Sequence, residues 1–217
     1  MAMHTGVLRR VYARDLPWPV HLGARLLLAN LLLALSSKIA VPLPWTPVPL
    51  TLQTFGVLLI AVLFGARTSA VAAGLYLVEG AAGLPVFQPL GAPGAAHLFG
   101  PTAGYLLAFP VAAFLTGRLM ELLFAPAQSA GTAPETASGT VDGPRTAMPR
   151  AILVGWLARA AAMLPGEAVI LLSGWAWLAA LVGARPAFGA GVWPFLGGEL
   201  AKIGAAAAIA LAMHRRG

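Results

Sequence analysis

The chain has 217 residues, of which 59% are apolar and 10% are charged, a balance far from that of soluble globular proteins. It therefore predicts an all-α integral membrane protein in a lipid bilayer, and the length allows about six crossings of roughly 20 residues each. The net charge of +7 is typical of basic cytoplasmic loops and does not favour a nucleic-acid partner. The absence of cysteine excludes disulfides, thiolate metal sites and cysteine nucleophiles.

Apolar segments follow one another along the chain, with glycine or proline at most junctions. They cover roughly 22–41, 52–66, 68–83, 101–124, 151–182 and 190–213. We expect one membrane domain, residues 1–217, with six transmembrane helices in one bundle. Residues 1–21 form the expected cytoplasmic N-terminal segment. Residues 125–150, rich in Pro, Ala, Gly, Ser and Thr, predict a flexible cytoplasmic linker between the fourth and fifth helices.

The arginines are distributed unevenly between the two sides that these crossings define. With the N-terminus inside, only Arg185 falls in an outer loop. The arginines on the inner side are Arg9, Arg10, Arg14, Arg67, Arg118, Arg145, Arg150, Arg215 and Arg216. Because cytoplasmic loops are enriched in basic residues, we expect both termini in the cytoplasm and loops 42–51, 84–100 and 183–189 outside.

Motifs of membrane enzymes and primary pumps are missing from the sequence. There is no H-E-x-x-H, no G-x-S-x-G and no pair of histidines at helical spacing, so catalysis and metal binding have little support. There is also no phosphate-binding G-x-x-x-x-G-K-[ST] loop. We therefore expect a protein that is not an enzyme and that depends on another chain for any ATP-driven action.

Charged residues inside the predicted helices are the first candidates for a site, because charges in a membrane usually face a partner or a cavity. Glu199 and Lys202 are three residues apart and share one helix face. They are either a structural ion pair or part of a ligand site open to the outside. In such a site lysine suits a ligand carboxylate, and a glutamate accepts hydrogen bonds from ligand N–H groups. Glu79 is a further candidate, whereas Arg159 and Glu167 receive no role.

An uncharged strip, residues 41–54, follows the first apolar segment and reads VPLPWTPVPLTLQT. Its prolines are Pro42, Pro44, Pro47 and Pro49. Because proline fixes φ and lacks an N–H, we expect an extended outer loop that could cover a small ligand. Trp45 is either part of this lid or an interfacial belt residue, and Thr51 and Gln53 offer hydrogen bonds. A second uncharged outer stretch, 83–106, adds Phe87 and Tyr105.

Four stretches together resemble the BioY family, the biotin-specific S components of energy-coupling factor (ECF) transporters. They read VPLPWTPVPLTLQTFGVLL, YLVEGAAGLPVF, LFGPTAGYLLAF and FLGGELAK. The resemblance implies an S-component-like bundle in the bacterial cell membrane that captures biotin from outside. It also implies a transmembrane coupling (T) subunit and ABC-type ATPase subunits as partners, and a lid formed by residues 41–51.

The resemblance also implies roles for single residues. Lys202 would contact the biotin carboxylate or its polar end, with Glu199 beside it. Glu79 stands where some members have asparagine, so its contact with the ureido ring is the less secure assignment. The secondary candidates for the pocket wall and lid are Trp45, Thr51, Gln53, Phe87 and Tyr105. Biotin is expected as a transported ligand, with no cofactor and no metal.

Two alternatives stay open beside biotin uptake. One is an S component for another vitamin, such as thiamin or riboflavin. The other is a small intramembrane enzyme with Glu199 and Lys202 as acid and base. The docking face for the coupling subunit also stays open, because Ala24, Ala29 and Ala34 in the first helix are five apart and do not give the A-x-x-x-A pattern.

Overall fold

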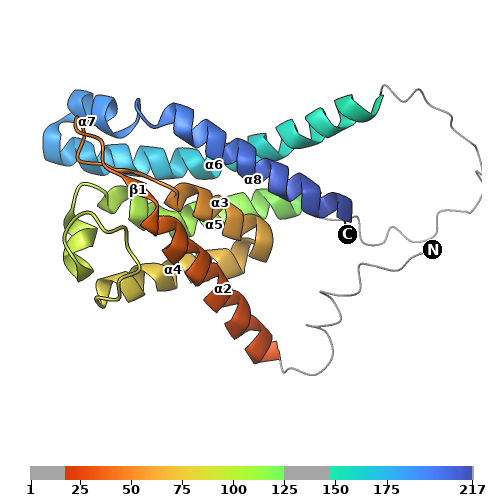
Figure 1. Ribbon diagram of the computed structural model, residues 1–217, viewed down its shortest axis with the longest axis horizontal. Helices are drawn as coiled ribbons and strands as arrows, with labels where there is room; N and C mark the ends of the chain where they lie inside the picture. Colours follow the sequence, from red (N-terminus) through yellow and green to blue (C-terminus); the bar gives the residue numbers. More distant parts are fainter. Residues whose placement is uncertain (1–17, 125–146, 217) are drawn as a thin grey trace, which may run out of the picture.

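The computed structural model describes residues 18–124 and 147–216, most of which lie in helices aligned roughly along one long axis (Figure 1). The longer helices are α2 (Trp18–Lys38), α3 (Gln53–Phe64), α4 (Ala66–Ala81), α5 (Ala103–Phe124), α6 (Ala147–Val182) and α8 (Leu196–Arg216). The shorter elements are strands β1 (Ala40–Val41) and β2 (Leu50–Thr51), the 3-10 helix η1 (Gly94–Phe99) and helix α7 (Ala184–Gly191). Most of the predicted segments 1–21 and 125–150 lies outside the described residues.

Four of the described helices are long and apolar enough to cross a membrane: α2, α5, α6 and α8. Helix α3 has 12 residues and α4 has 16, fewer than the roughly 20 that a full crossing needs. The mainly helical membrane bundle is therefore confirmed, whereas six full crossings are not.

The predicted outer loop 183–189 is wrong, because most of it is helix α7. Gly183 has a φ of 89°, which ends α6 and turns the chain directly into α7. The sixth apolar segment, predicted at 190–213, is divided between α7 and α8. Pro194 lies in the turn between them, where its missing N–H costs no helical hydrogen bond. The linker prediction also extends too far, since α6 begins at Ala147.

The strip between α2 and α3 forms a short antiparallel hairpin, β1–β2, in which Ala40 pairs with Thr51. Prolines lack the N–H that a strand ladder needs, so pairing is confined to two residues on each side. The Thr46 hydroxyl donates to the carbonyl oxygen of Ala190 at 2.7 Å, which ties the hairpin to α7. We call this end of the bundle the hairpin end; it also contains η1 (Figure 1).

Glycines set the close spacing of the central helices. A Cβ at Gly117 of α5 would lie 2.6 Å from the Cα of Ala66 at the start of α4. A Cβ at Gly174 of α6 would collide with the ring of Tyr105 on α5. Small residues at such positions let helix backbones approach closely, as is common in membrane bundles.

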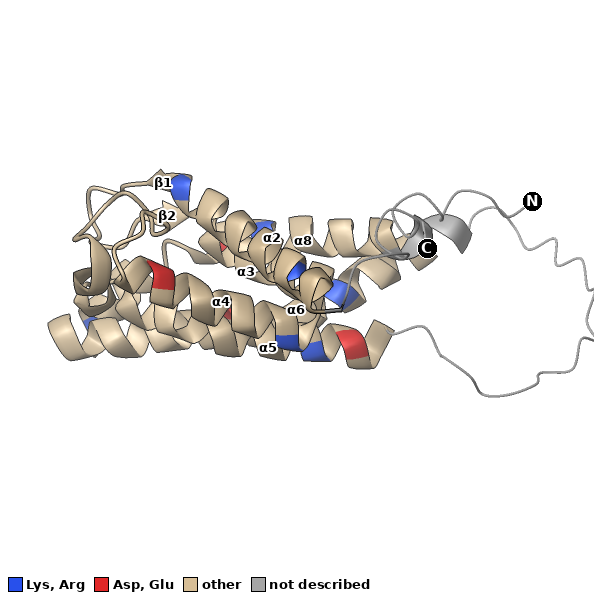
Figure 2. Ribbon diagram, turned by 90° about the horizontal axis from the view of Figure 1, so that it is seen from below, with Lys and Arg blue, Asp and Glu red and all other residues tan. Residues whose placement is uncertain are grey.

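Several charged residues lie at the end of the bundle opposite the hairpin, around the α3–α4 turn (Figure 2). There, Arg25 donates to the carbonyl oxygen of Phe64 at 3.1 Å, and Glu121 accepts from the Ala66 N–H at 2.7 Å. Arg118 lies 3.6 Å from Glu121. The arrangement agrees with the uneven charge distribution predicted from the sequence.

Candidate functional site

A buried polar cluster joins the start of α8 to the start of α3. The Lys202 ammonium donates to Glu199 Oε1 at 2.8 Å and to the hydroxyl of Thr54 at 3.0 Å. The Thr54 hydroxyl in turn donates to Glu199 Oε2 at 2.6 Å. All three side chains are buried. We call these three residues the Glu199 cluster.

Lys202 retains capacity for a further partner. A lysine ammonium has three N–H donors, and two of them are used by Glu199 and Thr54 within the described residues. The spacing of three residues brings Glu199 and Lys202 together on one helix face. One N–H donor of Lys202 therefore has no partner among the described residues.

The Glu199 carboxyl lines a narrow inner cavity of about 40 Å³ between α3, α5, α6 and α8. Its polar lining consists of Thr51, Gln53, Thr54, Gln88, Thr102, Tyr105 and Glu199. Its apolar walls are Val48, Pro49, Leu106, Phe109, Leu171 and Phe195. Apolar walls with a few convergent polar groups are typical of small-molecule sites.

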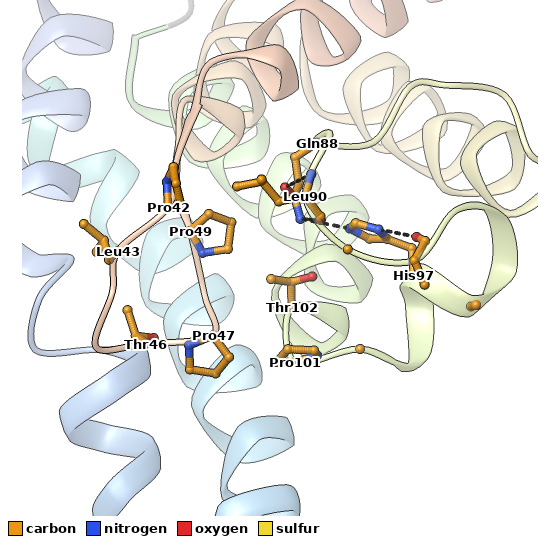
Figure 3. A pocket seen from close by; sticks show the side chains of 14 residues that line it. Pro42, Leu43, Thr46, Pro47, Pro49, Gln88, Leu90, His97, Pro101 and Thr102 are labelled. Atoms are coloured by element: carbon orange, nitrogen blue, oxygen red, sulfur yellow. Dashed lines mark hydrogen bonds between the residues drawn. The ribbon is translucent and has the colours of Figure 1, made fainter.

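A larger outer cavity of about 210 Å³ lies between the hairpin and the segment before α5. Figure 3 shows the hairpin residues Pro42, Leu43, Thr46, Pro47 and Pro49 on one side of this cavity. Gln88, Leu90, His97, Pro101 and Thr102 lie on the other side. The two cavities share Pro49, Gln88 and Thr102 in their linings, so they are neighbours between the hairpin end and the Glu199 cluster.

The segment after α4 is held in place by its own polar side chains. The Gln88 amide accepts from the Leu90 N–H at 2.8 Å and donates to the Leu90 carbonyl oxygen. Its nitrogen lies 3.4 Å from Nε2 of His97, whose Nδ1 lies 2.8 Å from the Ala92 carbonyl oxygen (Figure 3). The Phe87 ring stacks on His97 with centroids 4.9 Å apart. These contacts fix the Gln88 amide where both cavities meet.

Hydrogen bonds also orient the lining of the inner cavity. The Gln53 amide donates to the Tyr76 hydroxyl at 2.7 Å and accepts from the Thr51 hydroxyl at 3.2 Å. The Tyr105 hydroxyl donates to the Gly191 carbonyl oxygen at 2.6 Å, across the cavity mouth from α5 to α7. The side chains that a ligand would meet are therefore positioned before it binds.

The structure brings together several residues that the sequence singled out. Thr51, Gln53, Tyr105 and Glu199 all line the inner cavity. Lys202 is 9% exposed and lies directly behind Glu199. These five residues come from distant parts of the chain, and their contacts with a ligand stay predictions.

The other predicted residues differ in their position relative to the cavities. Phe87 is buried in the core, with its ring centroid 5.3 Å from that of Tyr76. Trp45 is 66% exposed, at the turn of the hairpin. Glu79 is half-buried on α4, outside the linings of both cavities. The prolines Pro42, Pro47 and Pro49 line the outer cavity, whereas Pro44 does not. The ligand contacts of these residues stay predictions.

Sequence reasoning gave no role to Gln88, Thr102, His97 or Glu167. The first three lie in the uncharged outer stretch, where a polar side chain among apolar residues is the available signal. The Lys38 ammonium, at the end of α2, donates to the Phe87 carbonyl oxygen at 2.8 Å. It therefore anchors the segment that carries Gln88.

A "Probable biotin transporter BioY" of Pyrococcus horikoshii is 35% identical over 164 residues, covering 76% of this chain and 79% of that protein. A "Biotin transporter BioY" of Rhodobacter capsulatus is 35% identical over 180 residues, covering 82% and 84% of the two chains.

The fold also resembles a solved structure, described as the S-component for biotin from an ECF-type ABC transporter. The TM-score is 0.70 at 19% identity, over 94% of this chain and 96% of that chain, which shows a shared fold. Residues 10–217 match the model of the BioY family. The chain therefore belongs to the BioY family.

Proposed function

We propose that this chain is a biotin-binding membrane subunit for biotin uptake. The observation that carries the proposal is the buried Glu199 cluster at the base of a cavity that reaches the hairpin end. It is supported by relatives named as biotin transporters and by the fold shared with an S-component for biotin. A family of transporters also favours binding and transport over catalysis.

The cavity chemistry suits the two ends of biotin. Biotin carries a carboxylate on a flexible apolar chain and a ureido ring with N–H donors and a carbonyl acceptor. The third N–H of Lys202 can pair with the carboxylate. Oxygens of Thr51, Gln53 and Glu199 can accept from N–H groups, and Phe109 is among the walls that can cover the apolar chain.

We also propose how the protein is oriented in the membrane and which subunits it works with. The hairpin end faces the outside of the cell, so biotin enters through the outer cavity, and the end with the α3–α4 turn faces the cytoplasm. Transport is energised by a transmembrane coupling subunit with ABC-type ATPases. This is supported by the absence of a phosphate-binding loop in the sequence and by the ECF-type origin of the structurally similar protein.

Titration calorimetry of the purified, detergent-solubilised protein tests the ligand. We expect binding of biotin that excess thiamin or riboflavin does not displace. Lys202→Ala should weaken it at least about 30-fold, because truncating one partner of a buried charge pair costs roughly 2 kcal/mol or more. Arg185→Ala, an exposed basic residue at the hairpin end, is the matched control and should bind as the wild type does.

The other outcomes separate the alternatives. Competition by thiamin or riboflavin would assign the site to a different vitamin. A change in the mass of biotin after incubation would favour an intramembrane enzyme. Wild-type affinity in a folded Lys202→Ala protein would remove Lys202 from the site.

A further inference from the structure

Glu167 is a buried acid that the proposed function does not use. It is 3% exposed, and neither of its carboxyl oxygens has a hydrogen-bond partner among the described residues. It lies within the apolar span Arg150–Val182 of α6. An ionisable side chain inside a membrane segment is costly, and it usually marks a functional site.

The charged groups nearest to Glu167 come from α8 and from α6 itself. Helix α6 packs against α8, and Leu171, one turn after Glu167 on the same face of α6, lines the inner cavity together with Glu199. Arg159 on α6 is eight residues earlier, about 12 Å along the helix. Its guanidinium carbon lies 4.4 Å from the centroid of the Phe124 ring. The Glu199 cluster is therefore the charged neighbour of Glu167.

Among the residues that the structure describes, the remaining helices that pack against α6 offer no competing partner. Helix α3 carries no titratable side chain. On α5, the Tyr105 hydroxyl is bonded at the hairpin end, and Arg118 and Glu121 are partly exposed at the opposite end. On α7, Arg185 is exposed at the hairpin end. The charged groups in this part of the bundle are therefore the carboxyl groups of Glu167 and Glu199 and the ammonium group of Lys202.

The two carboxyl groups have unequal surroundings. Glu199 accepts from Lys202 at 2.8 Å and from the Thr54 hydroxyl at 2.6 Å, so its negative charge is compensated. Within residues 18–124 and 147–216, Glu167 has no such donor. When an anionic ligand reaches Lys202, three carboxyl groups share one ammonium in a low-dielectric interior. A proton on Glu167 removes the charge that has no partner.

We propose that the protein binds its carboxylate ligand together with a proton that resides on Glu167. The inference rests on the proposed function, with biotin as the anion. The ligand brings one negative charge, and the proton from solvent neutralises one on Glu167, so the net charge of the site does not change. Glu167 acts through charge and is a positioning residue that does not touch the ligand.

The coupling between proton binding and ligand binding determines whether the affinity rises or falls with pH. Because the liganded state holds the proton more tightly, affinity decreases as pH rises through the range in which Glu167 titrates. The limit for one proton is about a tenfold increase in Kd for each pH unit. Lys202 is present in both the wild type and a Glu167 variant. A loss of affinity caused by deprotonation of Lys202 at high pH would therefore be the same in both proteins.

Calorimetry with the full chain, from pH 6 to 9 in pairs of buffers that differ in protonation enthalpy, tests the proposal. The wild type should take up as much as one proton per biotin in part of this range, where its Kd rises toward tenfold per pH unit. Glu167→Gln, which has nearly the same shape, should take up no proton there and should lack this slope. Glu121→Gln, a partly exposed acid at the far end of α5, should behave as the wild type does.

An uncharged ligand gives a second readout that needs no variant. Biotinamide should bind to the wild type without proton uptake, because it brings no negative charge. Biotin binding without proton uptake at any pH, or uptake that persists in Glu167→Gln, would overturn this inference alone. No biotin binding at any pH would overturn the proposed function as well.

Discussion

Thr54 connects the two charged side chains of the Glu199 cluster. Its hydroxyl donates to the carboxylate at 2.6 Å and accepts from the ammonium at 3.0 Å. It therefore holds both groups in one geometry, and it lines the inner cavity itself. The uncharged side chain of Thr54 thus orients the side chains of Lys202 and Glu199.

Thr54→Val should weaken biotin binding about 5- to 30-fold while the fold is retained. Valine has the shape of threonine, but the loss of the hydroxyl leaves two buried charged groups with one partner fewer, a cost of about 1–2 kcal/mol. Calorimetric Kd values would measure the effect. Thr68→Val, the same exchange in α4 outside both cavities, should bind normally. Equal affinity of the two variants would contradict the role of Thr54.

Residue spacing explains how much of the site could be predicted. The pairing of Glu199 with Lys202 follows from their spacing on one helix, which the sequence shows directly. The contact with Thr54 and the proximity of Glu167 depend on which faces of α3 and α6 meet α8. A single sequence carries no signal for that choice, so Glu167 had no role before the structure.

The hairpin is the element that the sequence predicted as a lid. Its prolines line the outer cavity, and Thr46 connects it to α7 through the hydrogen bond to Ala190. Trp45, at the turn of the hairpin, is 66% exposed and does not belong to the lining of either cavity. If the hairpin opens to admit biotin, the bond at Thr46 must break.

Thr46→Val should raise the dissociation rate of biotin about 2- to 10-fold, because one hydrogen bond that closes the hairpin contributes roughly 0.5–1.5 kcal/mol. Displacement of labelled biotin by an excess of unlabelled biotin measures the rate. Trp45→Ala is the informative comparison. A faster rate in that variant would support the lid role predicted from the sequence, and an unchanged rate would return Trp45 to the aromatic belt. An unchanged rate in Thr46→Val would show that this bond does not limit opening.

Helix spacing depends on glycines in a way that can be measured. Gly117→Ala should destabilise the bundle by about 1–3 kcal/mol, because the added methyl group meets the backbone of Ala66. Gly74→Ala on α4 has open space around it and should be neutral or slightly stabilising, since alanine favours a helix. Thermal unfolding in detergent, followed by tryptophan fluorescence, compares them. Equal midpoints would show that α4 and α5 tolerate a wider separation.

Apolar segments in the sequence predicted the positions of the long helices but not those of the short elements. Long apolar runs located α2, α5 and α6 to within a few residues, because a bilayer selects for length and hydrophobicity. Helix α7 was missed since its eight residues include Pro186 and several glycines, a composition typical of a loop. The two-residue strands were missed because alternation needs a longer segment to be recognised.

For the whole molecule, composition predicted the class, and the order of motifs predicted the family. The side of the membrane that each end faces rests on the arginine distribution. The chain has no cysteine, so an introduced one is its single thiol. Topology can therefore be tested without removing any native residue of that type.

Phe99→Cys, in η1 at the hairpin end, should react with a membrane-impermeant maleimide in intact cells. Phe99 is 74% exposed, so the thiol should be accessible. Arg67→Cys, in the first turn of α4 at the opposite end, should react only after permeabilisation. Labelling is read from the mass shift of the purified protein. The reverse pattern would invert the proposed orientation and place the outer cavity on the cytoplasmic side.

The short length of α3 has an electrostatic consequence. The chain enters the bundle as a hairpin before α3 starts at Gln53, so the first turn of this helix lies beside the inner cavity. Helix α8 also starts nearby, with Glu199 in its first turn. Aligned peptide dipoles place about half a positive charge at each helix N-terminus. An anion at this depth is therefore attracted by two helix dipoles as well as by the single ammonium group of Lys202.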